Sequence, residues 1–300
     1  MEIRRRDFLS GGLGLVASAG LARVQAQQPN SATPRPPKRE VPHRKVKTTN
    51  LFKAPPGYPN AVAIAPEGLW VAEQKKQNFG KDAQRSPEAC WLLDWNGKLL
   101  KTVLTESSNT SGMAYGDGCV WMGANGGPGG SEGIYQTDMN SKTVSHRQIP
   151  LGQVDDGGGC HGLMWHEDKL WIVANRLRGI LRVDPKSWEP EFMIPITTGR
   201  WHGIAWDNGG IWMVTGTSDV DRYIEKDGKL VHTTTSGLVK YDAATGQLLE
   251  TAEFVEGSAD PHGLAMHNGS LISCDAGIGP PGFELSNSPN GGYIFQIDFI

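Results

Sequence analysis

Short apolar stretches separated by tight polar turns recur along most of the chain, and no long segment shows the 3.6-residue period of a helix. Each repeat has an apolar strand, a turn such as Asp117-Gly118, and a second apolar strand. The five repeats cover residues 60–73, 111–125, 161–175, 202–215 and 262–275. Their starts are 51, 50, 41 and 60 residues apart, which is typical of four-stranded propeller blades with insertions.

A third apolar strand follows each repeat, and a fourth follows after a further turn, except that the chain ends at the third strand of the last repeat. Segment 44–52 precedes the first repeat and alternates like a strand without a partner. We therefore predict an all-β propeller of five four-stranded blades, in which segment 44–52 completes the last blade. Six blades are the alternative, although the length leaves no room for a sixth repeat.

The long connections of such a propeller all open on one face. In a blade, the connection into the innermost strand and the link between the second and third strands lie on the same side. The long connections here are of these two kinds: residues 74–89, 126–132, 152–160, 216–236 and 276–291. Long loops on a rigid scaffold carry binding and catalytic residues, so we expect the functional site on this face.

Three histidines, each followed by glycine, occupy one equivalent position at the start of the innermost strand: His161, His202 and His262. Three imidazoles at the axial mouth suit a zinc ion with an open coordination position, and calcium or another transition metal is the alternative ion. A structural His-Gly pair is the other interpretation, but Asn60 and Ser111 hold this position in the first two repeats, so a blade does not require histidine. The remaining histidines have no equivalent partners and are predicted to lie on the surface: His43, His146, His166, His232 and His267.

Polar residues at the ends of the second strands form another set near the same mouth. The acids Glu73 and Asp275 are candidate general bases, or partners that orient the imidazoles. Arg200 and Arg176 are candidates to hold a substrate carboxylate, because arginine offers two parallel donors. The candidates for substrate binding are Asn125, Asn175, Asn60, Ser111 and Tyr115. A structural place in a loop or an ion pair is the alternative for each of these residues.

The first 26 residues have the pattern of an export signal. Paired arginines followed by Phe8-Leu9 precede a short apolar run and the small-residue box Val24-Gln25-Ala26, which resembles a twin-arginine signal peptide. The apolar run is shorter than the ~20 residues that a membrane span needs. We therefore expect a periplasmic or secreted protein, with a flexible linker over 27–43 and the propeller domain over 44–300.

Composition limits the partners. The 300 residues carry a net charge of -3 without a basic excess, which argues against nucleic acid. We expect a monomer that acts on a small molecule and, after signal cleavage, does not contact a membrane. The four cysteines form no CxxC pair, so a thiolate zinc cage is not expected, while an oxidising compartment permits one or two disulfides: Cys90, Cys119, Cys160 and Cys274. Four tryptophans lie in mid-strand and are predicted to pack between blades: Trp70, Trp121, Trp171 and Trp212.

The repeated unit of His-Gly-Leu or His-Gly-Ile, a turn, and a strand containing Trp-Ile or Trp-Met resembles the NHL-type and lactonase-type propellers. It is similar to the gluconolactonase (senescence marker protein) family, which holds a divalent metal with Asn, Asp and Glu at the position of His161, His202 and His262. It is similar to the peptidyl-hydroxyglycine amidating lyase family, which places zinc on three histidines of a six-bladed propeller. It also resembles the virginiamycin B lyase family, whose propeller has seven blades. The resemblance implies a metal at the axial mouth.

These observations together predict an exported, metal-dependent lyase that cleaves a C–O bond of a small molecule. The metal would polarise a substrate oxygen, and Glu73 or Asp275 would remove a proton. A lactonase or ester hydrolase, in which the metal lowers the pKa of bound water toward ~7, is the alternative. An alternative of another class is a propeller without catalytic activity, whose loop face binds a glycan, peptide or protein.

Overall fold

The computed structural model describes residues 40–78, 86–125, 132–151, 159–196, 201–215, 223–226, 229–232, 236–279, 284–285 and 289–300. They belong to one compact unit, residues 40–300. The predicted signal peptide, the first thirteen residues of the predicted linker, and Arg200 lie outside the described residues. Within the described part, no helix is long and apolar enough to cross a membrane, and the one 3-10 helix is η1 (Lys76–Asn78).

Three blades are separate antiparallel sheets of four strands each. Blade 1 contains β2 (Tyr58–Ala65), β3 (Gly68–Gln74), β4 (Ala89–Leu93) and β5 (Leu99–Leu104). Blade 2 contains β6 (Thr110–Gly116), β7 (Cys119–Ala124), β8 (Gly133–Asp138) and β9 (Thr143–Arg147). Blade 3 contains β10 (Cys160–His166), β11 (Lys169–Ala174), β12 (Gly179–Val183) and β13 (Pro190–Pro195).

Blades 4 and 5 are joined into one eight-stranded sheet. Blade 4 contains β14 (Ile204–Asp207), β15 (Gly210–Thr215), β18 (Gly237–Asp242) and β19 (Leu248–Phe254). Blade 5 contains β20 (Leu264–His267), β21 (Ser270–Cys274), β24 (Tyr293–Phe299) and β1 (His43–Lys53). Two short hairpins lie in the long connections of these blades: β16 (Tyr223–Lys226) with β17 (Lys229–His232), and β22 (Ile278–Gly279) with β23 (Glu284–Leu285).

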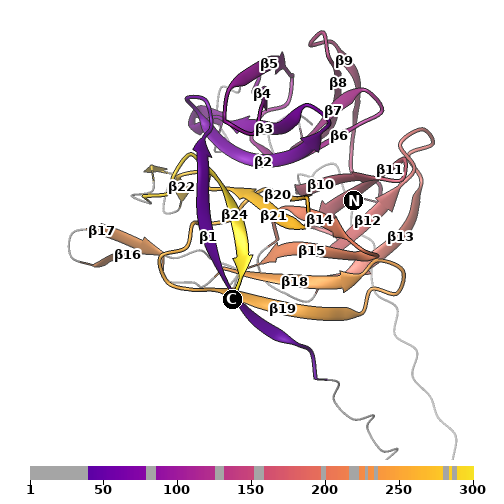
Figure 1. Ribbon diagram of the computed structural model, residues 1–300. Coiled ribbons are helices and arrows are strands. Elements are labelled where there is room, and N and C mark those ends of the chain that lie inside the picture. The colour runs from indigo at the N-terminus through magenta and orange to yellow at the C-terminus, as the bar shows by residue number, and fades with distance from the viewer. Residues whose placement is uncertain are drawn as a thin grey trace, which may run out of the picture. The chain divides into compact units, whose positions relative to one another are not determined.

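The N-terminal strand β1 closes the propeller. It pairs antiparallel with β24 from Val46 to Lys53, so it is the outer strand of blade 5. Its first residues also pair in parallel with β19, the outer strand of blade 4. Figure 1 shows the indigo β1 beside the yellow β24, which joins the two ends of the described chain. The predicted propeller of five blades with an N-terminal closing strand is confirmed.

The hairpins between first and second strands are tight because of their turn residues. In four blades both central residues have positive φ, which matches the right-handed twist of the flanking strands. These pairs are Asp117-Gly118, Glu167-Asp168, Asn208-Gly209 and Asn268-Gly269. The face that carries these turns is therefore compact.

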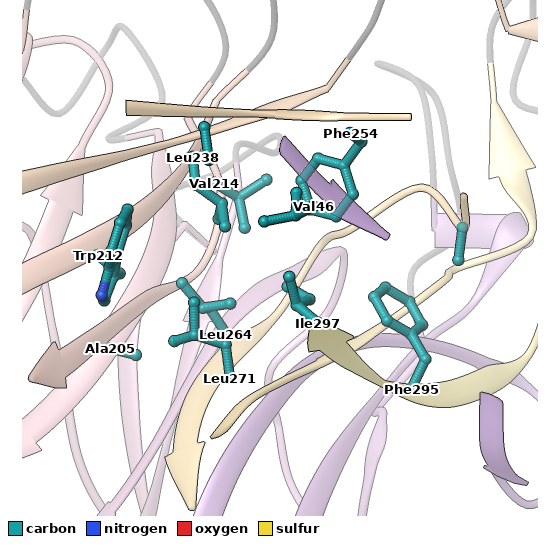
Figure 2. Packing of buried hydrophobic residues seen from close by; sticks show 12 residues of the cluster. Val46, Ala205, Trp212, Val214, Leu238, Phe254, Leu264, Leu271, Phe295 and Ile297 are labelled. Atoms are coloured by element: carbon teal, nitrogen blue, oxygen red, sulfur yellow. The ribbon is translucent and has the colours of Figure 1, made fainter. Parts of the chain in front are cut away.

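The hydrophobic core lies between neighbouring blades. The second strands are buried along almost their whole length, because both faces of each blade pack against another blade. Trp212 of β15 packs with Leu264 of β20 and Ile297 of β24, as Figure 2 shows for the junction of blades 4 and 5. The prediction that four tryptophans fill these junctions is confirmed, since each is at most 2% exposed: Trp70, Trp121, Trp171 and Trp212.

All four cysteines are buried and unpaired, so the structure contains neither of the one or two disulfides that an oxidising compartment would permit. Cys90 contacts Met122 across a blade junction, with its Sγ 3.0 Å from the Met122 Sδ. Burial raises the pKa of the Cys274 thiol to about 12, and it raises the pKa of Cys90, Cys119 and Cys160 as well. The thiols therefore pack as small apolar groups and have little thiolate for reaction at neutral pH.

Candidate functional site

The five equivalent positions at the starts of the innermost strands form a ring around the axis. Asn60, Ser111 and His161 lie where the pairing of the first two strands of their blades shifts register. One glycine separates His202 from the start of β14, and one glycine separates His262 from the start of β20. The five residues therefore lie outside the regular pairing of the first two strands, at the end of each blade where the mouth is.

In four of the five blades a glycine follows the ring position, and these glycines set how closely the blades approach. A Cβ on Gly203 would lie 2.5 Å from the Gly263 carbonyl carbon and 2.8 Å from the His262 oxygen of the next blade. Gly263 is equally close to blade 1, because its Cβ would lie 2.6 Å from the Val62 nitrogen. Gly112 and Gly162 face the backbone of their neighbours in the same way. The glycine of each His-Gly pair therefore has a structural role: without a side chain, it lets the innermost strands of five blades come close together at the axis.

The three histidine rings lie against one another. The centroid of the His202 ring is 4.9 Å from that of His161 and 4.6 Å from that of His262. All three residues are partly exposed, whereas Asn60 and Ser111 on the other side of the ring are buried. The mouth therefore presents a continuous surface of three imidazoles, with His202 in the centre.

His161 is held at both ring nitrogens. Its Nδ1 lies 2.5 Å from the carbonyl oxygen of Trp201, so Nδ1–H donates this bond. Its Nε2 lies 2.8 Å from Nδ2 of Asn125 and accepts the amide proton. The predicted mouth residue Asn125 thus contacts a predicted histidine directly. The guanidinium of Arg178 lies 5.3 Å from the centre of the Trp201 ring, which brings a cation to the same edge of the mouth.

His262 is held by a chain of carboxylates. Its Nε2 lies 3.3 Å from Oδ2 of Asp260, and Oδ1 of Asp260 accepts a hydrogen bond from Ser236. The predicted acid Asp275 stands one step further away: its two oxygens accept the backbone N–H groups of Asp260 and Gly277. Asp275 is 2% exposed, and these two bonds hold the loop that presents Asp260.

Asn60 and Ser111 join blades 1 and 2. The Asn60 amide donates to the Thr110 carbonyl oxygen at 2.9 Å and lies 3.5 Å from the Ser111 hydroxyl. Asn60 is 3% exposed. These contacts favour a structural role for Asn60 and Ser111, which connect blades 1 and 2 on the side of the ring that has no histidine.

The other predicted residues are placed less directly. Glu73 accepts the backbone N–H of Ala89 and lies 3.7 Å from the Lys75 ammonium, so it fixes the start of β4. Asn175 and Arg176 follow β11 at the mouth edge, and Arg176 is exposed. Tyr115 is four residues along β6 from the ring, where it lines an apolar axial cavity of 150 Å³ and packs 6.1 Å from Trp70. It is not brought together with the histidines.

Two residues that the sequence analysis did not select support the mouth. Asp260 is the nearer carboxylate to His262, and the signal for it was its place two residues before that histidine. Glu88 is fully buried and accepts hydrogen bonds from Lys75, Asn78 and the two residues that precede Ser111. Burial raises the pKa of the Glu88 carboxyl, although these donors oppose the shift. Its signal was the position directly before β4.

The three-histidine metal site stays a prediction, and hydrogen bonds to protein groups already hold some of its nitrogens. Two rings at 4.6–4.9 Å are near enough to share an ion. However, the nitrogens of His161 are both hydrogen-bonded to protein groups, and Nε2 of His262 faces Asp260. Among the described residues, no group of three or more His, Cys, Asp or Glu side chains is arranged to hold a metal ion. The donor set as placed is a hydrogen-bonded one, and zinc there stays a prediction.

Comparisons with known proteins identify the fold. No model of a protein family matches the sequence, and no curated protein matches it. The glutaminyl cyclase of Myxococcus xanthus is similar in structure, with a TM-score of 0.55 and 9% identity over 87% of this chain and 98% of that chain. A streptogramin B lyase structure has a TM-score of 0.42 and 13% identity over 85% of this chain and 98% of that chain.

The WD40 domain of Neurospora crassa Pan2 is similar with a TM-score of 0.42 and 11% identity, over 84% of this chain and 95% of that chain. At 9% identity, the likeness to the glutaminyl cyclase concerns the fold alone. The NHL-type resemblance and the twin-arginine signal stay predictions.

Proposed function

We propose that the protein is an enzyme that acts on a small molecule at the histidine mouth and cleaves a C–O bond by proton transfer, as a lyase. The observation that carries this proposal is the contact of three partly exposed imidazoles, with the Asp260 carboxylate 3.3 Å from the last of them. Histidine is the side chain best suited to gain and lose protons near neutral pH. Three such rings in series at the mouth favour acid–base chemistry over a structural role.

His202 is the ring that meets the substrate in this proposal. It lies between the other two rings and is partly exposed, and Nε2 is the nitrogen that we propose to react. His202 Nε2 takes a proton from the carbon next to the substrate carboxylate, a C=C bond forms, and the C–O bond breaks. The same nitrogen then gives the proton to the departing oxygen, so the step is balanced without a further reactant.

The neighbouring groups position that ring and the substrate. Asp260 orients His262 and stabilises positive charge that forms on the imidazoles, as a carboxylate does beside a catalytic histidine. Arg176 and Arg178 lie at the mouth edge of blade 3 and are the proposed ligands of the substrate carboxylate. The negative end of the mouth is thus at blade 5 and the positive end at blade 3, which fixes the orientation of an anionic substrate.

A substrate panel tests this proposal. Hydroxy acids and alkoxy acids test elimination, and lactones test the hydrolase alternative, each with wild type, His202→Asn and Asp260→Asn. We expect turnover of an acid by the wild type, a loss of roughly 10²–10⁴-fold in His202→Asn, and a smaller loss in Asp260→Asn. Circular dichroism shows whether both variants are folded.

The other outcomes decide against the lyase. Opening of a lactone by the wild type would replace the elimination by hydrolysis at the same site. Full activity in a folded His202→Asn variant would remove His202 from the chemistry. A panel compound that binds wild type and His202→Asn equally without turnover would favour the propeller without catalytic activity.

We also propose that residues 1–26 direct export by the twin-arginine route. The paired arginines and the following Phe8-Leu9 support this. Replacing Arg5 and Arg6 by lysine should retain the protein inside the cell, which fractionation of the producing cells measures. Export of that variant at the wild-type level would contradict the route.

A further inference from the structure

A second cavity lies between blades 3 and 4, on the face of the tight turns and away from the histidine mouth. Its volume is 390 Å³, within the range of small-molecule sites. Turn residues Glu167 and Gly209 line its edge. Its floor and walls include His166, Trp171, Arg182, Glu191 and Trp206.

At the equivalent position in blade 4, an indole and an ammonium donor both have an acceptor. Asp207 ends the innermost strand, and its Oδ2 accepts hydrogen bonds from Nε1 of Trp212 at 3.0 Å and from Nζ of Lys240 at 2.6 Å. Trp212 and Lys240 are partners across β15 and β18, and the Lys240 ammonium lies 5.5 Å from the centre of the Trp212 ring. One acceptor therefore satisfies an indole and a cation.

Blade 3 repeats this arrangement without the acceptor. Trp171 and Arg182 are partners across β11 and β12, and the Arg182 guanidinium lies 5.7 Å from the centre of the Trp171 ring. His166 stands where blade 4 has Asp207, five residues before the tryptophan. Within the described residues, Nε1 of Trp171 and Nε of Arg182 are buried and form no hydrogen bond. Nε of Arg182 does lie 3.1 Å from Oε2 of Glu191, without the alignment of a hydrogen bond.

His166 is turned away from this task. It was predicted to lie on the surface and is only partly exposed: its ring is stacked on Trp206 with a centroid distance of 3.7 Å, and its side chain is 25% exposed. Blade 4 packs over it there. Desolvation by burial lowers the pKa of the His166 imidazole, although Glu167 opposes the shift. The cavity thus has two buried donors that form no hydrogen bond, beside an aromatic wall.

The charges around the cavity are balanced already. The Lys169 ammonium lies 2.8 Å from Asp184 and 2.5 Å from Glu191, and Arg182 faces the other oxygen of Glu191. A further full negative charge would find no cation of its own, so the missing acceptor is better supplied by a neutral oxygen. Glu191, in turn, offers an acceptor to a ligand N–H.

We propose that this cavity binds a flat, neutral ligand that has a carbonyl next to an N–H, such as an aromatic amide or lactam. The carbonyl oxygen accepts hydrogen bonds from Trp171 and Arg182, as Asp207 does in blade 4. The N–H donates to Glu191, and the ring lies against Trp206. The site is separate from the histidine mouth and does not depend on the function proposed for it.

Titration with benzamide, followed by the indole N–H signals in a proton–nitrogen NMR spectrum, tests this proposal. Trp171→Phe assigns the Trp171 signal, and the Trp212 signal is the internal control because Asp207 already accepts its proton. We expect benzamide to move the Trp171 signal downfield and leave that of Trp212 in place. The affinity expected for nine heavy atoms is about 10 mM or tighter. Benzoate, which has the ring and the extra charge but no N–H, should bind at least several-fold more weakly.

Two variants separate a ligand site from a structural gap. His166→Asp supplies the acceptor that blade 4 has, so it should move the Trp171 signal without ligand and weaken benzamide binding at least tenfold. Arg182→Gln should also weaken it, whereas Lys240→Gln in blade 4 should not. A Trp171 signal that stays unmoved at several times 10 mM benzamide would overturn the proposal. Equal binding by wild type and a folded His166→Asp variant would overturn it as well.

Discussion

Replacing Gly203 by alanine tests how the narrow centre of five blades supports the mouth. The added Cβ would lie 2.5 Å from the Gly263 carbonyl carbon and 2.8 Å from the His262 oxygen, and it would also overlap the Leu264 nitrogen. Carbon atoms pack at about 3.5–4.0 Å, so blade 5 must move by roughly 1 Å or more. The backbone hydrogen bond from Gly203 to His262, 2.7 Å long, would then be strained or lost.

Two costs determine the expected magnitude. Overpacking a close contact costs about 1–3 kcal/mol, and leaving buried backbone groups unpaired costs about 1–3 kcal/mol. We therefore expect Gly203→Ala to lower the free energy of unfolding by about 4 kcal/mol. Gly209→Ala is the matched control, because Gly209 has φ 78 and no atom within 4 Å of an added Cβ. Its cost is the backbone strain alone, about 1 kcal/mol.

Urea unfolding, followed by tryptophan fluorescence, measures both variants. We expect a difference of about 3 kcal/mol between them, together with a changed environment of the His202 and His262 rings in Gly203→Ala alone. Unfolding free energies that agree within about 0.5 kcal/mol would refute the claim that the glycines hold the inner strands in contact.

Three further predictions concern stability. Burial alone would raise the pKa of Asp207, but hydrogen bonds from Lys240 and Trp212 lower it below its usual value. A carboxyl whose pKa is lowered in the folded state stabilises the fold, and this stabilisation is lost as the pH falls through the folded-state pKa. Asp207→Asn should therefore flatten the fall of Tm below pH ~4, which scanning calorimetry measures. Glu88→Gln places an amide against several buried donors and should cost about 3 kcal/mol in urea unfolding, against a small effect for Glu67→Gln. Removing residues 1–39 should leave Tm unchanged, whereas removing residues 1–53 deletes β1 and should prevent folding.

The fold was predictable from the sequence because each blade repeats the same short-range pattern. The apolar strands and the tight turns, such as Asn268-Gly269, recur at propeller spacing, and turn chemistry is a local property. The closing strand followed from counting, since the last repeat ends one strand short. These conclusions need no knowledge of how one blade packs on another.

The site was only partly predictable because its contacts cross from blade to blade. The equivalent positions of His161, His202 and His262 were visible in the repeats, and the structure brings their rings together. The bonds that hold them, such as that from His161 to the Trp201 carbonyl, depend on loop paths between blades. For the same reason, the stacking of His166 on a strand of the next blade left no local signal in its own repeat.

The nitrogen NMR signals of the His161, His202 and His262 rings, with and without zinc, test the central claim most directly. We predict a hydrogen-bonded set: His161 carries its proton on Nδ1, Asp260→Asn changes the His262 ring most, and one equivalent of zinc leaves the three rings in place. If one equivalent of zinc shifts all three rings together and displaces the His161 proton, the mouth is a metal site, and the proton-transfer account is wrong.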